Sequence, residues 1–149
     1  MEIIKGDLIK LAKSGYFDVI VHGCNCFCVM GAGIAKQIKK EFLEAYVADC
    51  NTKSGDPTKL GTFSCAIKNG VTVINAYIQF NYSRKSVNVD YNALRAVMNK
   101  IKKSFSGFKI GYPKIGAGLA GGDWNIISKI IDEELEGEDH TLVEYANEF

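Results

Sequence analysis

The feature that most constrains the fold is a junction within residues 17–38, where the spacing of apolar residues changes. Residues 17–24, FDVIVHGC, form an apolar run rich in β-branched side chains, which is typical of a buried strand. After Gly31 and Gly33, apolar residues recur every three or four positions, as on one face of a helix. A strand, a glycine loop and a helix in succession form the basic unit of α/β domains, in which helices cover a sheet.

The same two patterns extend over the rest of the chain. Asn69-Gly70 lies between two apolar alternating runs, which is a strong signal for a β-hairpin. Such a hairpin makes the predicted sheet mixed, and the helices between the other strands cover both of its faces. We therefore expect one α/β domain over residues 1–149, with three α/β/α layers and about six strands. Strands are predicted at 1–5, 17–24, 62–68, 71–78, 108–115 and 140–145, and helices at 8–14, 34–46, 91–105 and 124–135.

Composition excludes several classes of protein. The net charge of +1 provides no strong attraction for nucleic acid or an anionic membrane. No apolar run approaches the roughly 20 residues that span a bilayer, and the first residues show no signal-peptide pattern. Five cysteines are an odd number in a chain that is not a small secreted scaffold, which indicates free thiols in a reducing compartment. We expect a cytoplasmic protein with no membrane partner.

Two glycine loops of similar sequence, GAGIA at 31–35 and GAGLA at 116–120, each follow a predicted strand and precede a predicted helix. Glycine lets the backbone approach a ligand closely, and successive N–H groups at a helix N-terminus bind anions without a basic side chain. Two such loops at the carboxyl ends of strands predict a crevice for a diphosphate. The alternative is that both are tight turns in which glycine serves geometry alone.

A nicotinamide cofactor is a secondary alternative. GAGLAG at 116–121 fits the dinucleotide pattern G-x-G-x-x-G, and Glu144 lies at the distance of the ribose-binding acid. Too little chain follows for a full dinucleotide-binding half-sheet, so no cofactor is expected.

Four sulfur and nitrogen ligands alternate before the first loop: His22, Cys24, Cys26 and Cys28. On a continuing strand they would share one face, as a metal cluster requires. Zinc sites more often use closely spaced cysteine pairs from turns, and free cysteine is common in protein cores. We therefore expect packed thiols and no metal.

His22, Asn25 and Asp123 are the polar residues closest to the two loops, and they are the catalytic candidates. The chain has no Walker A lysine, G-x-S-x-G or H-E-x-x-H motif, which excludes P-loop kinases, serine hydrolases of that type and zinc peptidases. Each candidate also has a structural alternative. His22 can be a hydrogen-bonded core residue, Asn25 a turn former and Asp123 the cap of the helix that begins at Trp124.

The segments KGDL, HGCNCFCVMGAGIAKQI and YPKIGAGLAGGDW resemble, in this order, the macrodomain, an ADP-ribose-binding module. Within that family, the run HGCNC before the glycine loop is most similar to the yeast-type ADP-ribose-1″-phosphate phosphatases. The resemblance implies hydrolysis of the terminal phosphomonoester of ADP-ribose-1″-phosphate, giving ADP-ribose and phosphate. A non-catalytic reader of ADP-ribose, and a hydrolase that acts on ADP-ribosylated protein or nucleic acid, remain as alternatives.

The resemblance also implies roles for single residues. Asp7 would accept a hydrogen bond from the adenine amino group, Asn25 would hold the distal ribose, and Tyr145 would pack on the adenine. The two loops would surround the diphosphate and the distal ribose. The implied ligand-binding set is Asp7, Leu8, Asn25, Gly31, Ala32, Gly33, Ile34, Ala35, Gly116, Ala117, Gly118, Leu119, Ala120 and Tyr145.

The chain departs from relatives that remove ADP-ribose from glutamate or DNA bases. Those carry a lysine after the fourth strand, where this chain has Gln79-Phe80 and a lysine only later, at Lys85. They also carry an acidic residue in the second loop, where this chain has Ala120, with Asp123 three residues on. The departures favour the phosphatase, with His22 as general acid or water-orienting group and Asp123 as base.

Overall fold

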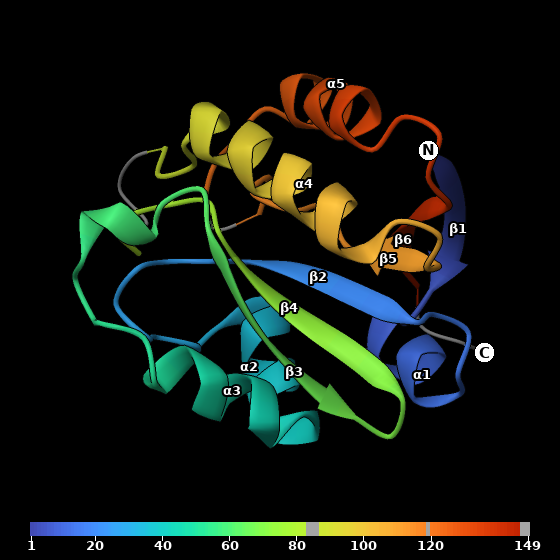
Figure 1. Cartoon of the computed structure of the whole chain (residues 1–149), viewed down its shortest axis with the longest axis horizontal. Coiled ribbons are helices and arrows are strands. Elements are labelled where there is room, and N and C mark those ends of the chain that lie inside the picture. Colours follow the sequence, from blue (N-terminus) through green and yellow to red (C-terminus); the bar gives the residue numbers. More distant parts are fainter. Residues whose placement is uncertain (83–86, 119, 147–149) are drawn as a thin grey trace.

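The computed structural model describes residues 1–82, 87–118 and 120–146, and in these residues six strands form one sheet between two layers of helices (Figure 1). The predicted α/β/α class and the mixed sheet are confirmed. The strands are β1 (Glu2–Gly6), β2 (Val19–Cys24), β3 (Phe63–Lys68), β4 (Val71–Tyr77), β5 (Ile110–Tyr112) and β6 (His140–Tyr145). The helices are α1 (Leu8–Lys13), α2 (Gly33–Glu41), α3 (Leu43–Cys50), α4 (Tyr91–Phe105) and α5 (Trp124–Glu134), with a 3₁₀ turn η1 (Pro57–Lys59).

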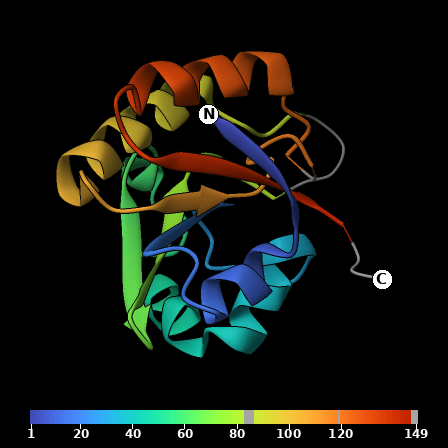
Figure 2. The same cartoon turned by 90° about the vertical axis from the view of Figure 1, so that its right-hand side faces the viewer.

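The strand order in the sheet is β1-β6-β5-β2-β4-β3. Figure 2 shows β6, in red, between β1 in blue and β5 in orange. All neighbouring strands are parallel except β3 and β4, which form the predicted hairpin. Asn69 and Gly70 both have positive φ, 52° and 81°, as a tight two-residue hairpin turn requires. The carboxyl ends of the five parallel strands therefore lie along one edge of the sheet.

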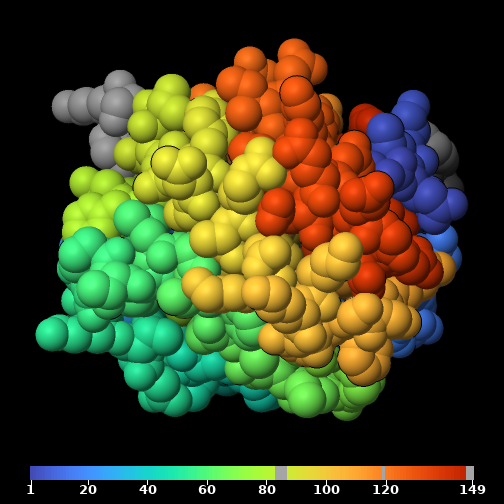
Figure 3. Space-filling model, turned by 45° about the horizontal axis from the view of Figure 1, so that its top comes forward, coloured from blue at the N-terminus to red at the C-terminus, as the bar shows by residue number. Residues whose placement is uncertain are grey.

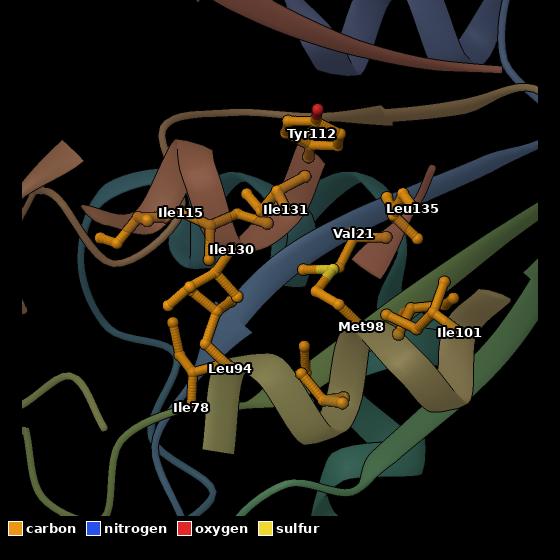
Figure 4. Packing of buried hydrophobic residues seen from close by; sticks show 14 of the residues in the cluster. Val21, Ile78, Leu94, Met98, Ile101, Tyr112, Ile115, Ile130, Ile131 and Leu135 are labelled. Carbon is orange, nitrogen blue, oxygen red and sulfur yellow. The ribbon is translucent and has the colours of Figure 1, made fainter. Parts of the chain in front are cut away.

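Apolar side chains cover both faces of the sheet. Along β2, Val19 and Val21 contribute to the core beneath α4 and α5, whereas Ile20 contributes to the core beneath α1, α2 and α3. Figure 4 shows Leu94 and Met98 of α4 directed toward the sheet. Burial of one such side chain contributes about 1.5–3 kcal/mol, so the two cores hold the strands in register.

Helices α4 and α5 lie against each other on the surface shown in Figure 3. The Arg95 guanidinium joins them, with Nη1 2.9 Å from Glu133 Oε2 and 3.2 Å from Glu134 Oε2. Exposed ion pairs of this kind contribute little, about 1 kcal/mol at most, so the apolar contacts carry the packing of α4 on α5. No helix among the described residues is both long enough and apolar enough to span a membrane.

Two predicted elements differ from the structure. The helix predicted over 34–46 is two helices, because Phe42 (φ −132°, ψ 67°) leaves the helical conformation. Its N–H still donates to the Ile38 carbonyl at 2.7 Å and its own carbonyl accepts from Ala45 at 3.0 Å, so both backbone groups of Phe42 remain hydrogen-bonded. The strand predicted over 108–115 is only three residues long, since Pro113 has no N–H to continue the ladder.

Candidate functional site

A cavity of about 460 Å³ opens at the carboxyl ends of β2 and β5. The chain leaves β2 for α2 on one face of the sheet and leaves β5 for α5 on the other face (Figure 1). Such a divergence between neighbouring parallel strands is where α/β sheets form ligand crevices. Of the predicted binding residues, Asn25, the whole 31–35 loop, Gly116, Gly118 and Ala120 line this cavity. Leu119 and Lys85 lie outside the described residues.

The first glycine loop leads directly into α2. Ala32 occupies the N-cap position in an extended conformation and makes no side-chain capping hydrogen bond, and Gly33 follows with φ of +59°. A Cβ added at Gly31 would meet no atom within 4 Å, so this backbone faces open space. The N-terminus of α2, with its first-turn N–H groups and the positive end of the helix dipole, therefore borders the cavity and suits an anion.

The second glycine loop closes on itself before α5. The Gly122 N–H donates to the Gly116 carbonyl at 2.7 Å, and Gly121 donates to Gly118 at 3.1 Å. Gly116 has φ of +72°, a conformation that favours glycine. Ala117 is absent from the cavity lining and packs instead against the core beneath α4 and α5.

Asn25 serves the turn that precedes the first loop and lines the cavity at the same time. Its Oδ1 accepts from the Phe27 N–H at 2.8 Å, and its Nδ2 donates to the Val29 carbonyl at 2.9 Å. These bonds hold the side chain in one orientation with 8% of its surface exposed. The turn-forming role that the sequence left open is thus present, and it presents the amide to the cavity.

His22 lies in the core and does not line the cavity. Its side chain is fully buried on β2, and Nε2 donates to the Asn75 Oδ1 of β4 at 2.6 Å. Burial lowers its pKa to about 4, although the hydrogen bond to Asn75 acts in the opposite direction. The imidazole is therefore neutral at neutral pH. This position matches the alternative that His22 is a hydrogen-bonded core residue. Cys24, which is nearer the end of β2, lines the cavity instead.

Asp123 is exposed, is not among the cavity-lining residues, and caps α5. Its Oδ1 accepts from the Asn125 N–H at 2.9 Å, and its own N–H donates to the Tyr91 hydroxyl at 3.0 Å. The side-chain contact of Asp123 is therefore that of a helix cap.

Asp7 and Tyr145, the residues implied for adenine binding, and Leu8 of the ligand-binding set lie at the same sheet edge but outside the cavity. Asp7 follows β1 and caps α1, with Oδ1 3.1 Å from the Lys10 N–H. Tyr145 ends β6, pairs in register with Gly6 and is 68% exposed. Leu8 is the first residue of α1, and its side chain is buried. A ligand that reached Asp7 and Tyr145 from the cavity would have to cross the ends of β5 and β6.

The sequence analysis missed several cavity-lining residues, among them Gln79 and Tyr82 after β4 and Lys114 after β5. Each follows the carboxyl end of a parallel strand, and that position was the available signal. Lys114 supplies a cation to the described lining, next to the second glycine loop.

A buried polar network connects His22 of β2 to the neighbouring strands and to α3. The Asn75 Nδ2 donates to the Ala45 carbonyl at 2.9 Å and to the Ser64 Oγ at 3.0 Å. The Tyr77 hydroxyl lies 2.7 Å from Ser64 and donates to the Asp49 Oδ1 at 2.7 Å. Burial raises the pKa of both the Tyr77 hydroxyl and the Asp49 carboxyl. The network joins β2, β4, β3 and α3.

The alternating residues do not continue on one strand, because β2 ends at Cys24, whose Sγ lies 3.5 Å from the His22 Nε2. Cys24 and Cys26 are buried, and burial raises the pKa of both thiols. The Cys28 Sγ points to the Asp49 carbonyl at 3.2 Å. Among the described residues, no three His, Cys, Asp or Glu side chains form a group that could hold a metal ion.

A family model for the macro domain matches residues 21–131. The match covers the cavity, both glycine loops and most of the sheet, and the chain therefore belongs to the macrodomain family. The chain is 39% identical over 145 residues to an uncharacterized 17.5 kDa protein of Enterobacteria phage T4, covering 89% of this chain and 88% of that one. It is 28% identical to the bovine ADP-ribose glycohydrolase OARD1 over 146 residues, covering 96% and 89%.

The yeast-type phosphatase branch is matched only in part. An ADP-ribose 1″-phosphate phosphatase of Meyerozyma guilliermondii is 36% identical over 63 residues, which is 40% of this chain and 35% of that one. Among solved structures, a Bacteroides thetaiotaomicron protein is 26% identical with a TM-score of 0.80, covering 97% and 98%. Thermosipho africanus DarTG in complex with ADP-ribose has a TM-score of 0.71 at 16% identity, covering 97% of this chain and 41% of that one.

Proposed function

We propose that this macrodomain binds ADP-ribose in the cavity between its two glycine loops. The observation that carries the proposal is the uncapped N-terminus of α2, which borders the cavity opposite the closed second loop. A diphosphate between them would meet backbone N–H groups and the positive end of the helix dipole. Family membership supports the same ligand, since a solved structure with this fold holds ADP-ribose.

In this proposal the strand ends set the direction of the ligand. The adenosine half extends along the ends of β5, β6 and β1 toward Asp7 and Tyr145, and the distal ribose lies near Asn25, beside the end of β2. The Asp7 carboxylate would then accept two hydrogen bonds, one from the Lys10 N–H, which is already present, and one from the adenine amino group.

Binding is the function that the geometry supports best. The described lining of the cavity contains amide, thiol, phenol and ammonium groups but neither an imidazole nor a carboxylate. General acid–base catalysis most often uses an imidazole or a carboxylate within hydrogen-bond reach of the reacting proton. We therefore assign His22 to the support of β2 and Asp123 to the cap of α5, and we give neither a direct catalytic role.

Hydrolysis of ADP-ribose-1″-phosphate is a second candidate, favoured by Lys114 on the cavity lining and by the partial match to the yeast phosphatase. In that reaction water adds to phosphorus as the bond from phosphorus to the ribose oxygen breaks, and ADP-ribose and inorganic phosphate are released. The Lys114 ammonium and the N–H groups of the first loop would stabilise the charge on the transferred group.

Calorimetry with ADP-ribose tests the proposal, with Gly31→Val as the variant. Gly31 has room for a side chain, so the fold should persist while the new side chain occupies the anion site. We expect a micromolar dissociation constant for the wild type, on the order of −8 kcal/mol, and a loss of at least about 100-fold in the variant without a fall in melting temperature. A folded wild-type sample that gives no heat with ADP-ribose would refute the proposal.

Product assays on the same preparations address the second candidate. Release of phosphate from ADP-ribose-1″-phosphate that is lost in Lys114→Ala would establish it. Release of ADP-ribose from modified protein or nucleic acid, without phosphate release, would establish a glycohydrolase instead, and neither product would leave a binding module.

A further inference from the structure

The sheet has two edge strands, β1 and β3, and only one of them is protected against pairing with another strand. An edge strand presents unpaired backbone N–H and C=O groups, which proteins usually protect with charged side chains, proline or a bulge. β1 carries the exposed charges of Glu2 and Lys5. β3 reads Phe-Ser-Cys-Ala-Ile over 63–67, without a charge or a proline, and reaches its one charged residue, Lys68, only at the hairpin. The edge formed by β3 is therefore unprotected along most of its length.

The pairing of β3 with β4 decides which backbone groups face this open edge. The Tyr77 N–H of β4 donates to the Thr62 carbonyl at 3.0 Å, just before β3 begins. Hydrogen-bonded pairs alternate along an antiparallel ladder, so the even-numbered residues of β3 bond to β4. The N–H and C=O groups of Phe63, Cys65 and Ile67 therefore point away from the sheet, and they have no hydrogen-bond partner among the described residues.

Apolar side chains accompany the open edge on one face of the sheet. Phe63 packs against the core beneath α4 and α5, and its ring centroid lies 6.0 Å from that of Phe105. Side chains alternate along a strand, so Cys65 and Ile67 lie on the same face as Phe63. Both remain exposed, and 69% of the Ile67 surface is accessible. An uncharged edge strand with exposed apolar side chains is a site where a further strand pairs.

The strand that fits this edge best is a second copy of β3. When two copies pair antiparallel about a two-fold axis at Cys65, Phe63 of each copy lies opposite Ile67 of the other. Every outward N–H then meets an outward carbonyl, and the exposed Ile67 packs against an aromatic ring. Lys68 lies opposite Thr62 in this register, so no like charges face each other. One strand thus supplies hydrogen bonds, apolar contacts and compatible charges for its own copy.

We propose that β3 forms the interface of a two-fold symmetric dimer, in which the sheets of two copies join edge to edge. The cavity lies at the ends of β2 and β5, and β3 contributes no residue to its described lining. Each copy therefore keeps its cavity accessible in the dimer. The inference does not depend on what the cavity binds.

Sedimentation equilibrium of the wild type, Ile67→Lys and Ile3→Lys tests the proposal. We expect the wild type to dimerise with increasing concentration. Ile67→Lys places a charge on the open edge and should raise the dissociation constant of the dimer at least about tenfold. Ile3→Lys is the matched control, because Ile3 is 60% exposed on the other edge strand, and the dissociation constant should change less than about twofold. Thermal melts verify that both variants fold.

Oxidative cross-linking provides a second measurement that leaves β3 unchanged. In the symmetric pair the two Cys65 Cα atoms would lie about 5.5 Å apart, within the range of about 4.4–6.8 Å that a disulfide spans. Mild oxidation should therefore link the wild type into a covalent dimer. Cys65→Ser should abolish the link, whereas Cys50→Ser, which removes another exposed thiol, should retain it.

Each result decides for or against the β3 interface. A dimer that Ile67→Lys weakens, that Ile3→Lys leaves intact and that cross-links through Cys65 supports it. A wild type that stays monomeric at every concentration overturns it. A dimer that tolerates Ile67→Lys, or that cross-links equally well after Cys65→Ser, also overturns it, because the interface would then lie elsewhere. If Ile67→Lys does not fold, the cross-link through Cys65 decides alone.

Discussion

The two glycine loops read almost the same, GAGIA and GAGLA, but the structure uses their glycines differently. In the first loop, Gly31 faces open space and the helix begins at once. In the second loop, a Cβ at Gly116 would lie 3.0 Å from a Val89 methyl. At Gly122, two residues beyond the loop, a Cβ would lie 2.6 Å from a Val89 methyl and 2.7 Å from the Gly116 carbonyl oxygen, and α5 begins only after Asp123. Glycine therefore leaves room for a ligand on one wall of the cavity and permits close packing on the other.

Gly122→Ala tests the packed wall and should have the largest effect on stability. The new methyl group meets a backbone oxygen that is fixed by its own hydrogen bond, so the loop has to move. We expect a loss of about 3 kcal/mol in the free energy of unfolding, measured by urea denaturation. A variant with wild-type stability would show that the second loop accommodates an added methyl group without a loss of stability.

The stability of the fold should depend on pH through His22, which lies on β2 just before the first glycine loop. Its folded pKa of about 4 lies below the ordinary value of 6.5, so folding favours the neutral imidazole. This stabilisation is fully present above pH 6.5 and is lost as the pH falls toward 4, by up to about 3 kcal/mol.

Urea denaturation between pH 7 and pH 4.5 measures that loss. His22→Gln should have a flatter stability profile over this range than the wild type. The matched variant His140→Gln should change the profile less, since burial lowers the pKa of His140 as well but its side chain is less completely buried. Equal profiles for His22→Gln and the wild type would contradict the assignment.

Asp123→Ala probes the start of α5 behind the packed wall. Loss of the cap to Asn125 should cost about 1 kcal/mol of stability. A matched Asp7→Ala removes a similar cap from α1, but it should also weaken ADP-ribose binding about tenfold or more, because a charge-assisted hydrogen bond to the ligand is lost. Thermal melts and calorimetry on both variants separate the two effects, and a fall in ADP-ribose affinity in Asp123→Ala would return Asp123 to the site.

Gly31→Ala and Gly118→Ala should have the smallest effect. Both positions have open space for a Cβ and neither has positive φ. Replacing glycine there narrows the unfolded ensemble and should stabilise the fold by about 0.4–1 kcal/mol. A loss of stability at either position would show that the loop needs glycine for its own conformation, which is the alternative left open by the sequence.

The sequence located both loops because a glycine pair between a strand and a helix is visible without a structure. The difference between them was not visible, since it depends on Val89, which approaches the second loop from a distant part of the chain. The partner of His22 was likewise not predictable, because strand alternation places its side chain on one face of the sheet but does not identify Asn75 as the group it contacts. Tyr82 and Lys114 were missed because only the strand order brings their segments together.

The break at Phe42 has a geometric consequence for the site. An unbroken helix over 34–46 would carry both its ends along one axis. With two short helices joined at one non-helical residue, the N-terminus of α2 borders the cavity while α3 keeps Asp49 against Tyr77. The residue that interrupts the predicted helix therefore gives each helix its own direction, one toward the cavity and one toward the buried network.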